Sequence, residues 1–183
     1  MKIGIISDTH DNIPNIEKAI NWMNQNRVER LLHCGDISTR ETMEFISRKF
    51  PGEIFAVFGN MDVGKNRNWE FPNVKLYPEI CEIKLDGNSS TGSGRRKISF
   101  CHMPKKAKEL AKTEKYDIVF YGHTHKPWEE KILVSPKPEG EGGGGGSCRL
   151  VNPGNIAGII YNPTFAVYNT STDKLELKIL EKL

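Results

Sequence analysis

Three short apolar stretches in the first third of the chain restrict its fold most, because each ends in a polar turn. They cover residues 3–6, 30–34 and 53–58 and are rich in residues that favour β-strands. Between them, apolar residues recur at helical spacing in 13–23 and 43–50. This alternation of strand and helix produces parallel strands joined by right-handed crossovers. The sequence therefore predicts an α/β fold whose first three strands end at one edge of a sheet.

The rest of the chain is richer in strands. Apolar patterning predicts a short helix at 107–112 and strands at 80–85, 97–101, 117–121, 128–134, 164–169 and 175–180. Asp11 or Asn12 can cap the first helix, and Ser38 or Thr39 the second. Stretches rich in Gly, Ser and Pro near 86–96 and 135–148 predict flexible loops. With 183 residues we expect one domain, 1–183, that carries these two loops.

The composition argues against several classes of protein. Hydrophobic residues make up 37% and charged residues 27% of the chain, which is typical of folded proteins and not of disordered ones. The net charge of +3 gives no strong sign of nucleic-acid binding. No apolar stretch is as long as a membrane span, so we expect no membrane partner.

The four cysteines give an expectation about the compartment. Cys34, Cys81, Cys101 and Cys148 have no C-x-x-C spacing, and three of them lie in or beside predicted strands. We expect free thiols in a reducing environment and therefore a cytoplasmic protein. The sequence does not fix the oligomeric state and is compatible with a homo-oligomer.

Side chains that can bind a metal ion follow five of the predicted strands: Asp8, His10, Asp36, Asn60, His102, His123 and His125. Each one alone is a weak indication, since an Asp can cap a helix and a His can be an ordinary loop residue. Together they lie where an α/β sheet binds its ligands. Oxygen and imidazole donors without a thiolate favour two divalent ions over a structural zinc. The fifth histidine, His33, lies within a predicted strand and is interpreted as a buried core or cleft residue.

The order of these motifs carries a resemblance. The chain contains, in this order, D-x-H from Asp8, G-D from Gly35, G-N-x-D from Gly59, the single His102, and G-H-x-H from Gly122. Over residues 3 to about 170 the sequence resembles the calcineurin-like metallophosphoesterase family. Its short length, the G-N-M-D form and the N-P-G-N turn at 152–155 resemble the small prokaryotic branch called YfcE/MJ0936-type phosphodiesterases.

The resemblance implies a four-layer α/β/β/α sandwich of two mixed β-sheets and a phosphoesterase, above all a phosphodiesterase. It implies two divalent metal ions, Mn²⁺ first, with Ni²⁺, Co²⁺, Fe²⁺ and Zn²⁺ as alternatives. The first ion would be bound by Asp8, His10, Asp36 and His125, and the second by Asp36, Asn60, His102 and His123. Asp36, Asn60 and His102 would then be the catalytic residues, and Asp62 would orient a histidine ligand or its neighbours.

The proposed chemistry explains these residue types. Two ions roughly 3.5–4 Å apart can hold a bridging hydroxide that attacks phosphorus in line. The two oxygens of Asp36 suit a bridge between ions, whereas the neutral Asn60 amide limits negative charge. Many larger relatives have a His after this Asn, which can protonate the leaving group. Met61 stands there instead and cannot transfer a proton, which favours leaving groups that need little help. Met103 and Pro104 after His102 are a second departure, which alters the wall of the cleft.

Three further functions stay open. The retromer subunit VPS29 is similar in fold but serves as a protein-binding scaffold with parts of the metal site altered. Asp36 and Asn60 keep the catalytic identity here, which favours an enzyme with a small phosphate-ester substrate. A phosphomonoesterase activity and a nucleic-acid-binding role without catalysis complete the set of functions that the sequence leaves open.

Deleting most of segment 136–146 should leave folding and hydrolysis nearly intact. Gly-rich loops bury little surface, and closure entropy changes by only about 0.6 kcal/mol for each doubling of loop length. Thermal melting and hydrolysis assays of the shortened chain check this. If hydrolysis were lost while the chain still melted cooperatively, the segment would be a lid and the prediction would be wrong.

Overall fold

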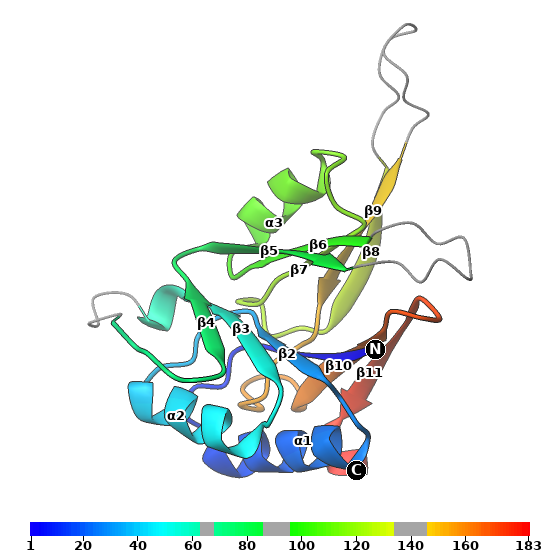
Figure 1. Ribbon diagram of the computed structural model, residues 1–183. Coiled ribbons are helices and arrows are strands. Elements are labelled where there is room, and N and C mark those ends of the chain that lie inside the picture. The colour runs from blue at the N-terminus through cyan, green and yellow to red at the C-terminus, as the bar shows by residue number, and fades with distance from the viewer. Residues whose placement is uncertain (63–67, 86–95, 134–145) are drawn as a thin grey trace, which may run out of the picture.

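The protein is described here by a computed structural model that covers residues 1–62, 68–85, 96–133 and 146–183. Eleven strands in these ranges form two mixed sheets that face each other (Figure 1). The first sheet has the order β11-β10-β1-β2-β3-β4, and the second has the order β5-β6-β7-β9-β8. Two helices cover the first sheet and one covers the second, so the layers run α/β/β/α. The predicted fold class is therefore confirmed.

The first sheet contains the predicted parallel core. It consists of β1 (Lys2–Ile6), β2 (Arg30–His33), β3 (Glu53–Val57), β4 (Val74–Tyr77), β10 (Thr164–Asn169) and β11 (Lys174–Ile179). Strands β1 to β4 are parallel, whereas β10 pairs antiparallel with both β1 and β11. The carboxyl ends of β1, β2 and β3 consequently meet at one edge, as the alternation of strands and helices predicts.

Helices α1 (Ile13–Gln25) and α2 (Arg40–Lys49) pack on the outer face of this sheet. The side chain of Asn12 caps α1 by accepting a hydrogen bond from the Asn15 amide, and Thr39 caps α2 in the same way. These caps resolve the two alternatives that the sequence leaves open. The buried stripe of α1 consists of Ile16, Ala19, Ile20 and Met23, at the helical spacing of the sequence pattern.

The second sheet consists of β5 (Ile80–Leu85), β6 (Arg96–Cys101), β7 (Ile118–Phe120), β8 (Trp128–Leu133) and β9 (Ser147–Asn152). Helix α3 (Pro104–Ala111) packs on its outer face around Cys101, Ala107 and Leu150. Between the two sheets lies a core that includes Ile5, Leu32, Phe100 and Phe120, each fully buried. Apolar contact between the sheets therefore fixes the strand ends of one sheet against those of the other.

Two strands differ from the sequence expectations. Strand β4 was not predicted, because its four residues form a short edge strand that is only half buried. Strand β9 begins at Ser147 and pairs with β8, so the predicted loop near 135–148 ends earlier than expected. The remainder of that loop up to residue 145, and residues 86–95 of the other loop, lie outside the described residues. Short 3₁₀ turns, η1 (Asn60–Asp62) and η2 (Leu180–Lys182), complete the chain.

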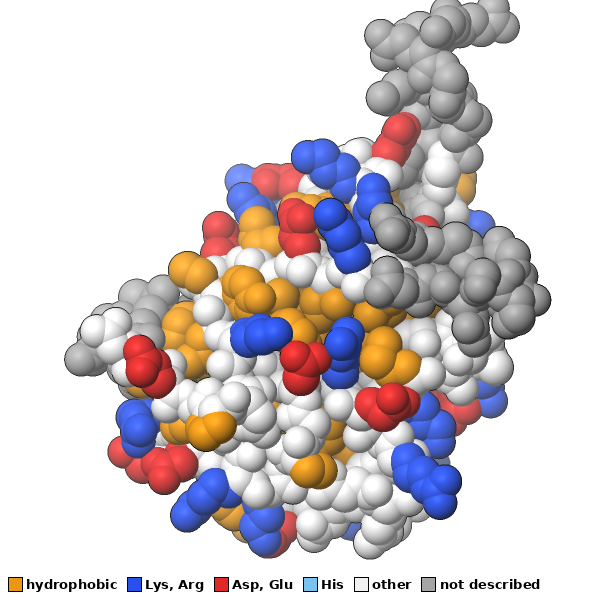
Figure 2. Space-filling model, viewed as in Figure 1, with side chains coloured by type: hydrophobic (Ala, Val, Ile, Leu, Met, Phe, Trp, Pro, Cys, Tyr) orange, Lys and Arg blue, Asp and Glu red, His pale blue; other side chains and the backbone are white. Residues whose placement is uncertain are grey.

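Within the described ranges, no helix is both long and apolar enough to cross a membrane. On the face shown in Figure 2, Lys and Arg side chains alternate with Asp and Glu, and hydrophobic side chains form a band between the two sheets. Over the described part of this face there is no continuous basic stripe of the kind that nucleic-acid-binding proteins carry.

Candidate metal centre

All seven metal-capable residues that follow the predicted strands meet at the edge where the two sheets face each other. Their backbone is unusual, because five of them have positive φ angles: Asp8 (52°), His10 (41°), Asp36 (56°), His123 (69°) and His125 (60°). Such angles are uncommon outside glycine and cost about 1–3 kcal/mol each, and they cluster at functional sites. The tight turns aim these side chains at the space beyond the strand ends.

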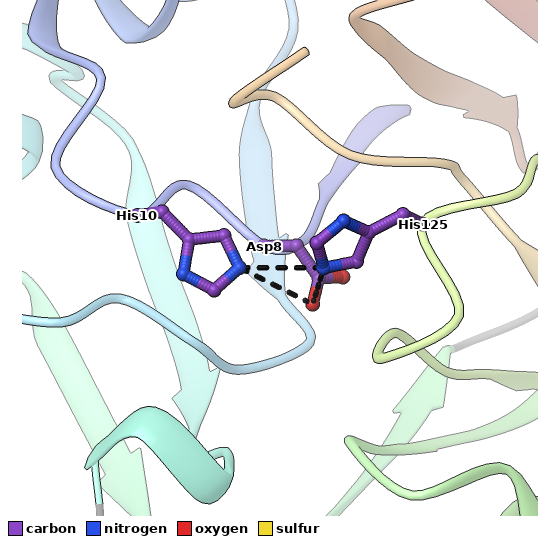
Figure 3. A group of neighbouring side chains, drawn as sticks. All are labelled: Asp8, His10 and His125. Carbon is purple, nitrogen blue, oxygen red and sulfur yellow. Dashed lines mark hydrogen bonds and ion pairs between the residues drawn. The ribbon is translucent and has the colours of Figure 1, made fainter. Parts of the chain in front are cut away.

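The first group of side chains is Asp8, His10 and His125 (Figure 3). The two Nε2 atoms of His10 and His125 are 3.3 Å apart. The Oδ1 atom of Asp8 lies 3.3 Å from Nε2 of His125 and 4.0 Å from Nε2 of His10. Residues 115 positions apart in the sequence thus point two ring nitrogens and one carboxylate oxygen at a common point.

The second group surrounds His102 and Asn60. Nε2 of His102 lies 2.8 Å from Oδ1 of Asn60 and 3.4 Å from Oδ2 of Asp36. The same Asn60 oxygen is 2.8 Å from Nδ1 of His123. Asp36 also lies 3.8 Å from Nε2 of His10, so its carboxylate stands between the two groups. This is the position that a bridging ligand would need.

The donor set fits divalent metal ions. Nδ1 of His102 donates its proton to the Cys34 carbonyl oxygen at 2.9 Å. In the neutral ring, Nε2 therefore has only a lone pair, which points at the oxygens of Asn60 and Asp36. A lone pair that faces two oxygens repels their lone pairs, so the arrangement needs a cation between them, either a proton or a metal ion. Convergent carboxylate, amide and imidazole donors suit ions such as Mn²⁺ or Zn²⁺.

The glycines of the three motifs make room for these donors. A Cβ on Gly35 would lie 2.7 Å from Nδ1 of His102, and the φ of this residue is +97°. A Cβ on Gly59 would lie 2.2 Å from Oδ1 of Asp36, and one on Gly122 would lie 2.0 Å from the buried Ser7 hydroxyl. The Gly before each donor is therefore part of the site, because any larger residue would displace a ligand or its support.

Asp62 holds the loops of the centre together. Its buried carboxylate accepts hydrogen bonds from the amides of Ile37, Ser38 and Gly59, at 3.3, 2.8 and 2.8 Å. It thereby joins the turn that carries Asp36 to the turn that carries Asn60. Within the described residues its hydrogen bonds go to these amides and not to a histidine ligand, so it orients the neighbours of the ligands.

His33 supports the centre from the core. Its Nδ1 accepts a hydrogen bond from the Gly35 amide, so its Nε2 carries the proton and donates to the Thr9 hydroxyl at 3.1 Å. Thr9 in turn donates to the carbonyl oxygen of Asp36 at 3.2 Å. Burial lowers the pKa of His33 to about 4 despite the nearby carboxylates, which keeps the ring neutral. The interpretation of His33 as a buried core residue is confirmed.

Asn152 and Asn155 support the centre, a role that their N-P-G-N turn did not reveal in the sequence. The Asn152 amide donates to the Gly122 carbonyl oxygen and the Thr124 hydroxyl, at 2.9 Å each. Asn155 donates to the carbonyl oxygen of His125 at 3.1 Å. The turn thus fixes the loop of His123 and His125, and the only sequence signal for this was two Asn residues flanking a Pro-Gly pair.

The carboxylates and histidines shift one another's protonation. Burial would lower the pKa of His102, but the hydrogen bond with Asp36 and the charge of Asp8 raise it above 6.5. The hydrogen bond with Asp8 likewise raises the pKa of His125 above 6.5. Burial would raise the pKa of Asp36, but His102 and the Met61 amide hold it below 3.8. The histidines and carboxylates therefore stabilise one another's charged forms.

Comparison with known proteins identifies the family. The model of the calcineurin-like phosphoesterase superfamily domain matches residues 1–173. The chain belongs to this superfamily. It is 29% identical over 189 residues to phosphodiesterase MJ0936 of Methanocaldococcus jannaschii, an alignment that covers 99% of this chain and all of the relative. The resemblance stated from the motifs is confirmed.

Solved structures of related proteins agree with this assignment. A structure described as a novel archaeal phosphodiesterase has a TM-score of 0.74 and 27% identity, covering 98% of this chain and 99% of its own. Vps29 from Chaetomium thermophilum has a TM-score of 0.59 and 15% identity, covering 98% and 95%. The second likeness shows a common fold alone. The same sandwich thus occurs in a phosphodiesterase and in Vps29.

Adding Mn²⁺ to the metal-free phosphoesterase should raise its melting temperature, and more at pH 8 than at pH 6. Protonated His102 and His125 stabilise the metal-free fold below about pH 6.5, and this stabilisation is lost as the pH rises through their raised pKa values. A metal ion must displace these protons, so its contribution grows over the same range. Differential scanning fluorimetry after chelation, with and without Mn²⁺, measures both trends.

Asp36→Asn should remove most of the shift caused by Mn²⁺. The matched control is Asp173→Asn, which changes an exposed carboxylate that pairs with Arg96 far along the sequence. This control should keep the full shift. If Mn²⁺ left the melting temperature of the unmutated chain unchanged at both pH values, the assignment of a metal centre would be wrong.

Proposed function

We propose that this phosphoesterase is a metal-dependent phosphodiesterase that acts on small phosphodiesters. The observation that carries the proposal is the convergence of seven donor side chains into two adjacent groups with Asp36 between them. Phosphate esters are anions, and a pair of cations that shares a carboxylate is suited to bind and polarise them. The full-length relative named a phosphodiesterase supports the same activity.

The ligand assignment follows the two groups. Asp8, His10, Asp36 and His125 would hold the first ion, and Asp36, Asn60, His102 and His123 the second. Mn²⁺ is our first choice for a donor set of oxygen and imidazole nitrogen, with Ni²⁺, Co²⁺, Fe²⁺ and Zn²⁺ as alternatives. When bound, the ions would supply Lewis-acid stabilisation of the phosphate oxygens and a lowered pKa for a water nucleophile.

The residues of the chain itself set the charge and geometry for this reaction. Asp8 and Asp36 are buried and held by the amides of His123 and Met61, so their carboxylates cannot turn away. Asn60 contributes oxygen without charge, which leaves the site more positive toward an anionic ester. His102 is fixed by the Cys34 carbonyl oxygen and presents Nε2 to the site. We assign Asp36, Asn60 and His102 the central catalytic positions.

Met61, the residue that follows Asn60, cannot act as an acid, and this favours diesters over monoesters. Met61 is 53% exposed at this position, and its side chain has no proton to give. His33 is fully buried and engaged with Gly35 and Thr9, so it is not available to a substrate. The scaffold alternative rests on the shared fold with Vps29 alone and has less support, because all seven donors are retained here.

We also propose a cytoplasmic location. Cys34, Cys81, Cys101 and Cys148 are all free and buried, and none is paired with another in a disulfide. Burial raises the pKa of Cys81 and Cys101 to about 12, so both remain unreactive thiols. Free thiols at these positions are typical of a reducing compartment. Fractionation of the source cells tests this assignment.

With Mn²⁺ present, bis(4-nitrophenyl) phosphate should be hydrolysed with a higher kcat/KM than 4-nitrophenyl phosphate. Asp36→Ala should lower kcat/KM for the diester by at least about a hundredfold, because both ions lose a ligand. Asp173→Ala is the matched control and should retain activity. Release of 4-nitrophenolate measures all three, and a monoester preference would overturn the assignment as a phosphodiesterase.

Rates should also fall steeply as the leaving group becomes less acidic. Met61 cannot protonate the departing oxygen, so log kcat/KM for substituted phenyl diesters should decline with the pKa of the leaving phenol. Met61→His should recover activity on the poorest leaving groups, roughly tenfold, by supplying an acid. If chemistry limits the rate and the plot is flat, an effective proton donor exists and this explanation is wrong.

A further inference from the structure

A pocket opens directly beside the second group of the metal centre. Its volume is about 200 Å³, and two of its lining residues, Asn60 and His102, belong to that group. The other lining residues come from three separate segments: Phe58 and Gly59, Pro78 and Glu79, and Met103. If the centre binds the phosphate of an ester, the ester group on this side of the phosphate would therefore lie in the pocket.

The wall of the pocket is mostly apolar. Phe58 is 7% exposed and therefore held in place by packing. Met103 is a large hydrophobic residue and is nevertheless 41% exposed. Met103 lies at the N-cap of α3 but makes no side-chain cap, so its side chain is not used by the helix. Exposed apolar groups gathered beside polar groups are typical of a ligand site.

The pocket has room for one ring or a short branched chain. An apolar cavity of ~150 Å³ holds benzene in another protein, so about 200 Å³ accommodates a group of that size. Its contents would be desolvated on one side by Phe58, Pro78 and Met103. A large apolar ester group gains more binding free energy from such burial than a methyl group, because it buries more apolar surface.

Glu79 adds a second element of selectivity. Among the described residues that line the pocket it is the only carboxylate, and it is exposed. Within the described residues it makes no ion pair. Its negative charge opposes an ester group that carries a further phosphate.

We propose that this pocket binds one ester group of the phosphodiester, and that it selects an apolar group about the size of a ring without a negative charge. The inference rests on the proposed function and names the substrate class of that same site. Phosphodiesters whose attached group carries another phosphate would be poor substrates. Met103 and Glu79 are then the residues that determine specificity.

Three probes with poor leaving groups, and of equal charge at the central phosphate, test the pocket: dimethyl phosphate, methyl benzyl phosphate and methyl 4-phosphonobenzyl phosphate. Calorimetry on the Mn²⁺-loaded protein gives the Kd of each, and inhibition of bis(4-nitrophenyl) phosphate hydrolysis gives a second value. Methyl benzyl phosphate should bind roughly tenfold more tightly than dimethyl phosphate, as expected for a buried apolar group. The phosphono probe should bind several-fold more weakly than the benzyl probe.

Two variants and one control assign the effects to residues. Met103→Gln should cut the benzyl preference to about a third or less, since it removes apolar contact while it leaves the size similar. Glu79→Gln should recover binding of the phosphono probe relative to the benzyl probe. Leu177→Gln replaces an exposed apolar residue of β11 outside this pocket and should change neither ratio.

The outcomes separate this inference from the proposed function. Equal Kd values for dimethyl and methyl benzyl phosphate, or a preference that survives Met103→Gln, would overturn the pocket while diester hydrolysis still stands. A preference that follows Met103, together with no hydrolysis of bis(4-nitrophenyl) phosphate, would support the pocket and overturn the proposed function. If Glu79→Gln slowed hydrolysis of diesters with poor leaving groups instead, Glu79 would be an acid, and its role as a selectivity residue would be overturned.

Discussion

Two buried carboxylates that lie close together are the constraint on which the centre depends. Asp8 and Asp36 are at most 2% exposed, and each offers an oxygen within 4.8 Å of the other and of a His102 nitrogen. Like charges at this separation in a buried site are costly unless cations compensate them. The histidines and the backbone amides of His123 and Met61 partly do so. Such a site would gain from binding divalent cations, as the family implies.

The rest of the fold holds these groups in place against their own preferences. The left-handed backbone of the donor residues and the repulsion of the carboxylates both favour a looser arrangement. Opposing this, the core between the sheets and the core under α1 and α2 bury many Ile, Leu and Phe side chains, each contributing about 1.5–3 kcal/mol. The loops of the site are held to this framework by side-chain hydrogen bonds of Asp62, His33, Asn152 and Asn155. Stability of the cores thus offsets strain at the site.

The same sandwich is found in a phosphodiesterase and in Vps29, and a shared fold does not by itself decide the function. What distinguishes this chain is the complete set of donors and the surface around them. Exposed Met61 and Met103 flank the centre, each directly after a donor in the sequence, Asn60 and His102 respectively. If the centre holds divalent cations as proposed, an apolar rim beside it would suit an ester that is anionic at phosphorus and apolar elsewhere.

The sequence by itself determined the strands of the α/β core, the capped helices and the seven donor residues, because these follow from local spacing and from motifs within a few residues. Only the tertiary structure decided which donors meet, since His10 and His125 lie 115 residues apart. It also revealed β4 and β9, whose short segments become strands through hydrogen bonds to neighbouring strands. The supports Asn152 and Asn155 and the pocket of Phe58, Pro78, Glu79 and Met103 were likewise invisible in the sequence. Each is made by segments that only the packing of the two sheets brings together, and no local pattern encodes such contacts.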